Sequence, residues 1–178
     1  MAIVAISRQL ATFGDEIASV AAEKLKFKFI RKDELEKRIV QLGFSAEKLG
    51  KYDEKKPGFF AALVKDRDEY LHYLQTAVLE AASQNNCVLI GRGAYIILEG
   101  VPNVVSFRLV AEDSVRQERL QNEFAYTSKQ ARQKIDESDK DRSGFHKSFF
   151  NADIADPTHF HFVLNTGFVE TEEAGSFI

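Results

Sequence analysis

The stretch Ala2–Leu25 reads AIVAISRQLATFGDEIASVAAEKL, and it decides the fold predicted for the whole chain. Its start, Ile3–Ile6, is a continuous apolar run, as in a strand buried on both faces of a parallel sheet. A loop of about eight residues leads to a helical period from Asp15, whose carboxylate favours the positive end of the helix dipole. The pattern predicts the first half of a βαβ unit. Backbone N–H groups at such a helix start often bind phosphate, although an ordinary β–loop–α connection has the same pattern.

The remaining apolar runs alternate with helical segments, which predicts a doubly wound parallel sheet. Strands are expected at 27–30, 87–90, 104–110 and 160–164, and helices at 32–42, 45–49, 59–84, 112–124 and from Ser128, as cap, towards 142. Residues 51–58 are expected to form a loop or hinge, residues 144–157 to be irregular, and a last helix to start near 172. The segment 31–85 is therefore a helical excursion between two strands, and such excursions often cover a substrate.

Length, composition and charge indicate one globular domain. The 178 residues are 44% hydrophobic and 29% charged, which are ordinary values. A net charge of −3 gives no support to a nucleic-acid partner, and no segment reaches the ~18 apolar residues that span a membrane. Cys87 is the single cysteine, so no intramolecular disulfide can form, and no signal-peptide pattern is present. A cytoplasmic setting is expected, and the oligomeric state is left open.

Small and polar residues follow three of the predicted strands, at the sheet edge where α/β proteins bind ligands. These stretches are 7–14, Gly91–Arg92–Gly93 and Asn165–Thr166–Gly167. Arg92 stands between two glycines, so a ligand can approach the backbone closely while the planar guanidinium binds a phosphate with two hydrogen bonds. The alternative is an ion pair between Arg92 and a carboxylate at the sheet edge.

Further arginines gather after the fourth predicted strand. Arg116 and Arg119 are three residues apart on one helix face, and Arg132 and Arg142 follow among interleaved acidic residues. Such interleaving is typical of solvated, ion-paired helices, and the alternative is a lid whose arginines fold over transferred phosphates. His159 and His161 have no apparent third ligand, so we expect structural roles for both rather than a metal site.

Together these motifs resemble the cytidylate kinase-like family, a branch of the P-loop nucleoside monophosphate kinases. The resemblance spans nearly the whole chain and is carried by Ile3–Arg8, Gly14–Ala18, Asp33–Leu35, Asn86–Ala94, the Arg116/Arg119 helix, Asp139–Arg142 and Phe162–Thr166. It implies an α/β, P-loop NTPase-type three-layer fold with a five-stranded parallel sheet. The single domain would comprise a core (1–30, 86–126 and 158–178), a helical monophosphate-binding lobe (31–85) and a lid (127–157).

The resemblance also implies roles for individual residues. The first loop would bind the phosphates of ATP, through Ser7, Arg8, Ala11, Thr12, Phe13, Gly14, Asp15 and Glu16. Gly91, Arg92 and Gly93 would hold the phosphate of the acceptor nucleotide. Arg116, Arg119 and Arg142 would neutralise charge during transfer, with Mg²⁺ as the second cofactor and no protein metal ligand assigned. Phosphoryl transfer depends on in-line positioning, Mg²⁺ and positive charge, so arginines rather than a nucleophile carry the chemistry.

The first loop departs from the superfamily pattern. Ala11 and Phe13 fall at glycine positions, Gly14 at the lysine that reaches the terminal phosphates, and Glu16 at the hydroxyl that binds Mg²⁺. The bulky Phe13 disfavours a positive φ angle at its position. The expected function is ATP-dependent phosphoryl transfer to a nucleoside monophosphate, cytidylate-like, or to a related small acceptor, by a kinase with a degenerate P-loop. The alternative is a catalytically inactive nucleotide- or anion-binding protein on the same fold.

Overall fold

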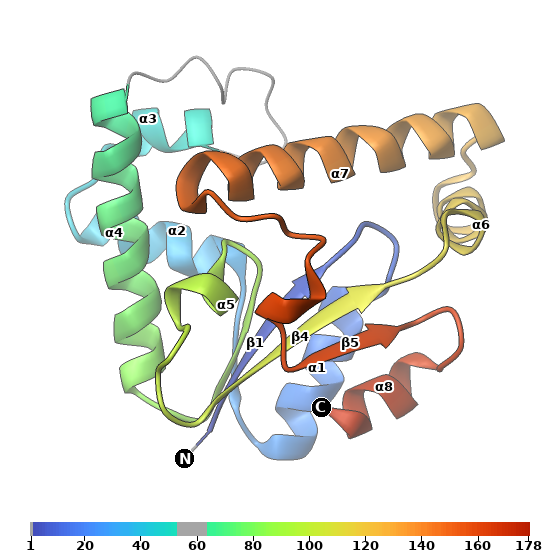
Figure 1. The fold of residues 1–178 in the computed structure, drawn as a ribbon, viewed down its shortest axis with the longest axis horizontal. Coiled ribbons are helices and arrows are strands. Elements are labelled where there is room, and N and C mark those ends of the chain that lie inside the picture. The colour runs from blue at the N-terminus through green and yellow to red at the C-terminus, as the bar shows by residue number, and fades with distance from the viewer. Residues whose placement is uncertain (1, 53–63) are drawn as a thin grey trace.

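Residues 2–52 and 64–178 are described here from a computed structural model of the chain (Figure 1). Five parallel strands form one sheet in the order β2-β3-β1-β4-β5. Their bounds are Ile3–Arg8 (β1), Lys28–Ile30 (β2), Cys87–Ile90 (β3), Val104–Val110 (β4) and Phe162–Asn165 (β5). The predicted five-stranded parallel sheet is confirmed. The expected loop at 51–58 lies largely outside the described residues.

The helices alternate with these strands as the sequence predicts. They are α1 (Gly14–Leu25), α2 (Lys32–Gln41), α3 (Ala46–Leu49), α4 (Val64–Ser83), α5 (Ala94–Ile97), α6 (Asp113–Phe124), α7 (Ser128–Phe150) and α8 (Thr171–Phe177). Two 3₁₀ turns, Gly50–Tyr52 and Pro157–His159, complete the described elements. The short helix α5, directly after the Gly91–Arg92–Gly93 turn, is not predicted from the sequence.

Helix α7 differs most from the prediction, because it continues to Phe150 where residues 144–157 were expected to be irregular. Gly144 lies inside the helix, and the turns around it are held by the buried aromatic side chains of Phe145 and Phe149. The N-cap is Thr127 rather than Ser128. The Thr127 hydroxyl accepts from the backbone N–H of Gln130 at 3.3 Å, and the Gln130 side chain accepts from the Thr127 N–H at 2.9 Å.

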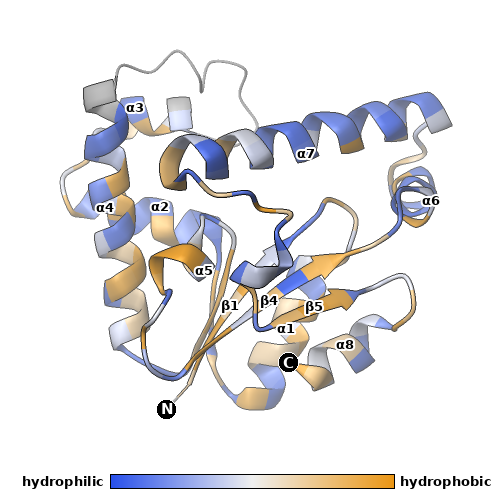
Figure 2. Ribbon diagram, in the orientation of Figure 1, coloured by the Kyte–Doolittle hydropathy of each residue, from blue (hydrophilic) through white to orange (hydrophobic). Residues whose placement is uncertain are grey.

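The two faces of the sheet are covered by different helices. Val4 and Ile6 of β1 pack with Ile17 of α1 and Ala174 of α8. Ile3 and Ala5, which alternate with them, share a second apolar cluster with residues of α4, α5 and α7. The strands are mostly apolar, whereas much of the α7 ribbon is hydrophilic (Figure 2). Helix α7 therefore has an apolar side on the core and a polar side towards water.

The position of α7 defines where a ligand can bind. In Figure 1 this helix runs above the arrowheads of β1 and β4, and the loop that follows β1 lies beneath it. The carboxyl ends of parallel strands are the usual ligand edge of an open α/β sheet. No helix within residues 2–52 and 64–178 is long and apolar enough to cross a membrane.

Candidate functional site

The loop between β1 and α1 has the backbone of a glycine-rich loop without the glycines. Ala11 and Phe13 both adopt left-handed conformations, with φ angles of 60° and 54°. Thr12 is fully buried and its hydroxyl donates to the carbonyl of Gln9 at 3.0 Å. Gln9 in turn accepts from the N–H of Ala111 at 3.1 Å, which ties the loop to the end of β4. A positive φ angle is disfavoured for residues such as Ala11 and Phe13, so the surrounding contacts hold the loop in this shape.

This conformation predicts an unusual response to an Ala→Gly change. A left-handed backbone costs a non-glycine residue about 1–2 kcal/mol, which offsets the roughly 0.5–1 kcal/mol that glycine normally loses. We expect Ala11→Gly to leave the free energy of unfolding unchanged or to raise it. The matched control Ala81→Gly, in α4, should lower it by roughly 0.5–1 kcal/mol. Urea unfolding of both variants makes the comparison, and equal losses would contradict strain at Ala11.

Arg8 connects the first loop with the turn after β3. A Cβ atom placed on Gly14 would lie 2.6 Å from Arg8 Cγ, and one on Gly91 would lie 2.7 Å from Arg8 Nη1. Both glycines therefore allow the arginine to lie directly against backbone. Arg8 Nη2 is also 3.8 Å from the carboxylate of Asp15 at the start of α1. The predicted residues Arg8, Gly14, Asp15 and Gly91 are thus brought together.

Arg92 points towards the helical insert. All three residues of Gly91–Arg92–Gly93 have positive φ angles, of 80°, 54° and 69°. The Arg92 side chain is 1% exposed, donates to the carbonyl of Tyr52 at 2.7 Å and forms an ion pair with Glu36. Its guanidinium also lies 5.7 Å from the ring centre of Phe145 in α7. This arrangement agrees with the ion-pair alternative, and phosphate binding by Arg92 stays a prediction.

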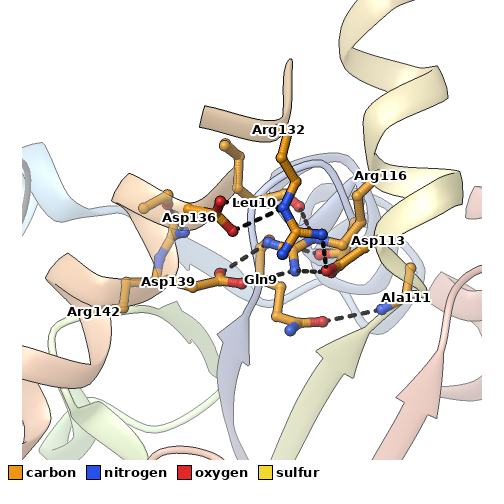
Figure 3. Close-up of polar contacts among 11 residues, drawn as sticks. Gln9, Leu10, Ala111, Asp113, Arg116, Arg132, Asp136, Asp139 and Arg142 are labelled. Carbon is orange, nitrogen blue, oxygen red and sulfur yellow. Dashed lines mark hydrogen bonds and ion pairs between the residues drawn. The ribbon is translucent and has the colours of Figure 1, made fainter. Parts of the chain in front are cut away.

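Arg116 holds α6, α7 and the first loop together (Figure 3). It is fully buried and binds the carboxylate of Asp139 through two hydrogen bonds of 2.8 Å each. It also contacts Asp113 at 3.2 Å and donates to the carbonyl of Leu10 at 2.9 Å. Two carboxylates and a carbonyl therefore already occupy this guanidinium, which gives Arg116 a positioning role for the loop.

Arg119 is engaged in a similar way on the other side of the loop. It donates to the carbonyl of Ala11 at 3.1 Å and to the hydroxyl and carbonyl of Thr166 at 3.0 and 2.5 Å. Its guanidinium lies 4.3 Å from the ring centre of Phe13, a cation–π distance. Partial burial lowers the pKa of Arg119 from its ordinary value. The bulky Phe13 thus has a packing partner that stabilises its place in the loop.

Arg142 comes from α7 and lines a cavity of about 150 Å³ beneath that helix. The cavity is formed by residues 8–16 with Leu120, Glu123 and Phe124 of α6, so it contains seven of the eight predicted ATP-binding residues. Arg142 is 9% exposed and donates to the hydroxyl of Ser138, one turn earlier in α7. A larger cavity of about 650 Å³ lies away from this edge, between β2, α2 and α4. Within the described residues, no group of three or more His, Cys, Asp or Glu side chains is placed to bind a metal.

Sequence reasoning missed one arginine of this region, Arg108 in β4. Its side chain is 8% exposed and donates to the hydroxyl of Ser7 at 2.7 Å. Burial lowers the pKa of Arg108 to about 10, with a further contribution from Arg142. A charged residue inside the apolar strand VVSFRLV was the available signal.

The described fold is that of the P-loop kinases. An uncharacterized protein from Eubacterium ventriosum superposes with a TM-score of 0.79 at 20% identity, covering 99% of this chain and 94% of that one. Shikimate kinase from Bacteroides thetaiotaomicron gives 0.58 at 13% identity, over 99% and 95% of the two chains. A gluconokinase from Sinorhizobium meliloti gives 0.57 at 15% identity, over 98% and 87%. At these identities the likeness defines the class of fold.

The sequence itself matches the model of the cytidylate kinase-like family over residues 3–167. The chain belongs to this family, as the motifs predicted. No curated protein matches the chain.

Proposed function

We propose that the protein is a Mg²⁺-dependent phosphotransferase that moves a phosphoryl group from ATP to a nucleoside monophosphate, cytidylate-like, or to a related small acceptor. The observation that carries the proposal is the cavity beneath α7, where the first loop and Arg142 face the same space. Family membership supports phosphoryl transfer in general. A Bacillus subtilis neighbour, YorR, was solved with phosphorylated GDP, at 13% identity and a TM-score of 0.54 over 98% and 92% of the two chains.

The residues at the cavity fit a chain of phosphates. Helix α1 begins at Gly14 without a side-chain cap, so its first backbone N–H groups are available to an anion. Arg8 and Arg142 supply positive charge in place of the absent lysine. At about 150 Å³ the cavity is smaller than the ~300–1,000 Å³ of a complete ligand pocket. It therefore suits the phosphates, with the nucleoside lying outside it.

Asp15 and Glu16 also line the cavity, and they suit the metal better than the phosphate. Mg²⁺ keeps several waters and is usually held by one or two carboxylates together with phosphate oxygens. When bound, this ion would neutralise phosphate charge and orient the phosphates. A site of this kind needs no cluster of three protein ligands, and Asp15 or Glu16 would hold the ion. The proposal therefore requires Mg²⁺ for nucleotide binding.

The chain's own part in the reaction is positioning and charge. The loop and the start of α1 would hold the donor phosphates, while Arg116 and Arg119 fix the loop through the Leu10 and Ala11 carbonyls. Arg142 would place positive charge against the phosphoryl group as it moves. Helix α7 lies over the loop and would shield the transfer from water, and we propose residues 127–157 as the lid for this reason.

The test is product formation with ATP, Mg²⁺ and each of CMP, UMP, AMP and GMP, followed by chromatography of the nucleoside diphosphates. We expect one acceptor to be phosphorylated. Its turnover rate should lie below the typical kinase range of about 1–100 per second, because the loop lacks its lysine. Removing Mg²⁺ with EDTA should abolish the product.

The second candidate is a nucleotide- or anion-binding protein without catalysis. It is favoured by one observation, that carboxylates and backbone carbonyls already occupy Arg116 and Arg119. Saturable binding of ATP with Mg²⁺ and no product from any acceptor would select this second function.

A further inference from the structure

Arg108 has hydrogen-bond donors that no group in the described part of the chain uses. Its Nη1 donates to Ser7 Oγ at 2.7 Å. Ser7 and Arg108 are paired directly in the register of β1 and β4. Within residues 2–52 and 64–178, no group accepts a hydrogen bond from its Nε or Nη2. The side chain is nevertheless more than nine-tenths buried. Nε and Nη2 still reach the solvent, so an anion can approach these two donors.

No carboxylate in the described part of the chain forms an ion pair with Arg108. The charge of Asp139 raises the pKa of Arg108, but both Asp139 oxygens bind Arg116. Arg142 is near enough to lower that pKa, so the two cations repel each other. An anion between Arg108 and Arg142 would relieve this repulsion and use the open donors.

The strand register shows on which side of the sheet this anion would lie. Phe107 and Leu109 belong to the apolar cluster under α1 and α8, so Arg108, which alternates with them, faces α5 and α7. The first loop instead leads to α1 on the opposite face. Arg142 lies near both the cavity of the first loop and Arg108, because it lines that cavity and its charge lowers the pKa of Arg108. A group bound at Arg108 would therefore lie beside the donor phosphates rather than among them.

We propose that Arg108 and the Ser7 hydroxyl bind the phosphate group of the acceptor, on the side of the sheet that faces α7. The Ser7 oxygen accepts from Arg108, so its own hydrogen is available to donate to a phosphate oxygen. The fork of Nε and Nη2 matches two phosphate oxygens. The identification of the bound anion as the acceptor's phosphate rests on the proposed function. The anion site itself follows from Arg108, Ser7 and Arg142.

The experiment compares Arg108→Met with Arg38→Met, which changes an arginine of α2 that is 44% exposed and pairs with Glu80. Calorimetric titrations use CMP, cytidine and ATP with Mg²⁺, and thermal unfolding is followed with inorganic phosphate against NaCl of equal ionic strength. For the wild type and Arg38→Met we expect phosphate to raise the unfolding midpoint by roughly 2–4 °C. In Arg108→Met this rise should vanish and the affinity for CMP should fall about 100-fold, as expected for lost charge-assisted hydrogen bonds. The affinities for cytidine and ATP should stay within about threefold.

Several other outcomes would overturn the inference. It fails if phosphate and CMP bind Arg108→Met as well as the wild type, if neither binds the wild type, or if the variant loses ATP instead of CMP. A lower unfolding midpoint with unchanged CMP affinity would assign Arg108 to the fold alone. Product formation is a separate readout. CMP binding that depends on Arg108, without any product, would support this inference and refute the proposed transfer. Normal product formation by Arg108→Met would support the proposed transfer and refute this inference.

Discussion

Replacing Arg142 with alanine should reduce turnover at least about 1,000-fold while the affinity for ATP with Mg²⁺ changes only a few-fold. An arginine that stabilises charge in the phosphoryl-transfer transition state is worth about 10³–10⁵ in rate. Arg142 is the arginine of α7 that lines the cavity of the first loop, and it donates a hydrogen bond to Ser138 of its own helix. Rate and ground-state binding should therefore separate in this variant.

The control for Arg142→Ala is Arg132→Ala on the same helix. Arg132 is half exposed and pairs with Asp113 and Asp136, outside the cavity of the first loop (Figure 3). Exposed pairs of this kind contribute about 0–1 kcal/mol, so the control should fold and turn over nearly as the wild type does. Single-turnover kinetics and a binding titration measure the two quantities. Equal turnover in the two variants would remove Arg142 from the reaction.

Arg92→Met should lower the free energy of unfolding by about 2–4 kcal/mol. Breaking a fully buried ion pair from one side costs about 3–5 kcal/mol, but Glu36 is partly exposed and keeps Lys32 at 3.6 Å. The change would leave the Glu36 carboxylate and the Tyr52 carbonyl without the guanidinium that binds them. For a chain of this length the unfolding midpoint should fall by roughly 10 °C. Urea unfolding measures the loss, provided that the dependence of the unfolding free energy on urea concentration is the same in both proteins.

A double-mutant cycle distinguishes the two interpretations of Arg92. If the ion pair is the main role, Glu36→Gln combined with Arg92→Met should cost less than the sum of the single changes, because the partners are coupled. If Arg92 instead holds the acceptor phosphate, Glu36 must release it, and Arg92→Met should weaken CMP binding with little effect on unfolding. The second result would restore the role that the flanking glycines suggested.

Much of the fold could be predicted because it depends on local patterns. The strands are short continuous apolar runs, and the sheet they form follows from their alternation with helices. Two of the local errors have different physical causes. Gly144 suggested an end to α7, but buried Phe145 and Phe149 continue the helix, and α5 is a single turn with no period to detect.

The site was harder to predict because arginines differ by their partners and not by their sequence context. Arg116 and Arg142 carry the same side chain and lie near similar acidic residues in the sequence. Only the fold brings Asp139 of α7 against Arg116 of α6, 23 positions apart, and leaves Arg142 at the loop. Arg108 depends on a contact with Ser7 across 101 positions, which no periodicity could reveal.

The left-handed residues Ala11, Phe13 and Arg92 have a consequence for recognising relatives of this protein. A glycine at such a position indicates a positive φ angle only indirectly, and here residues other than glycine adopt that angle. Neighbouring contacts, such as the Phe13 ring on Arg119, make the angle tolerable for another side chain. A search for distant relatives that scores the sign of φ along the loop would keep this chain, whereas one that counts glycines would discard it.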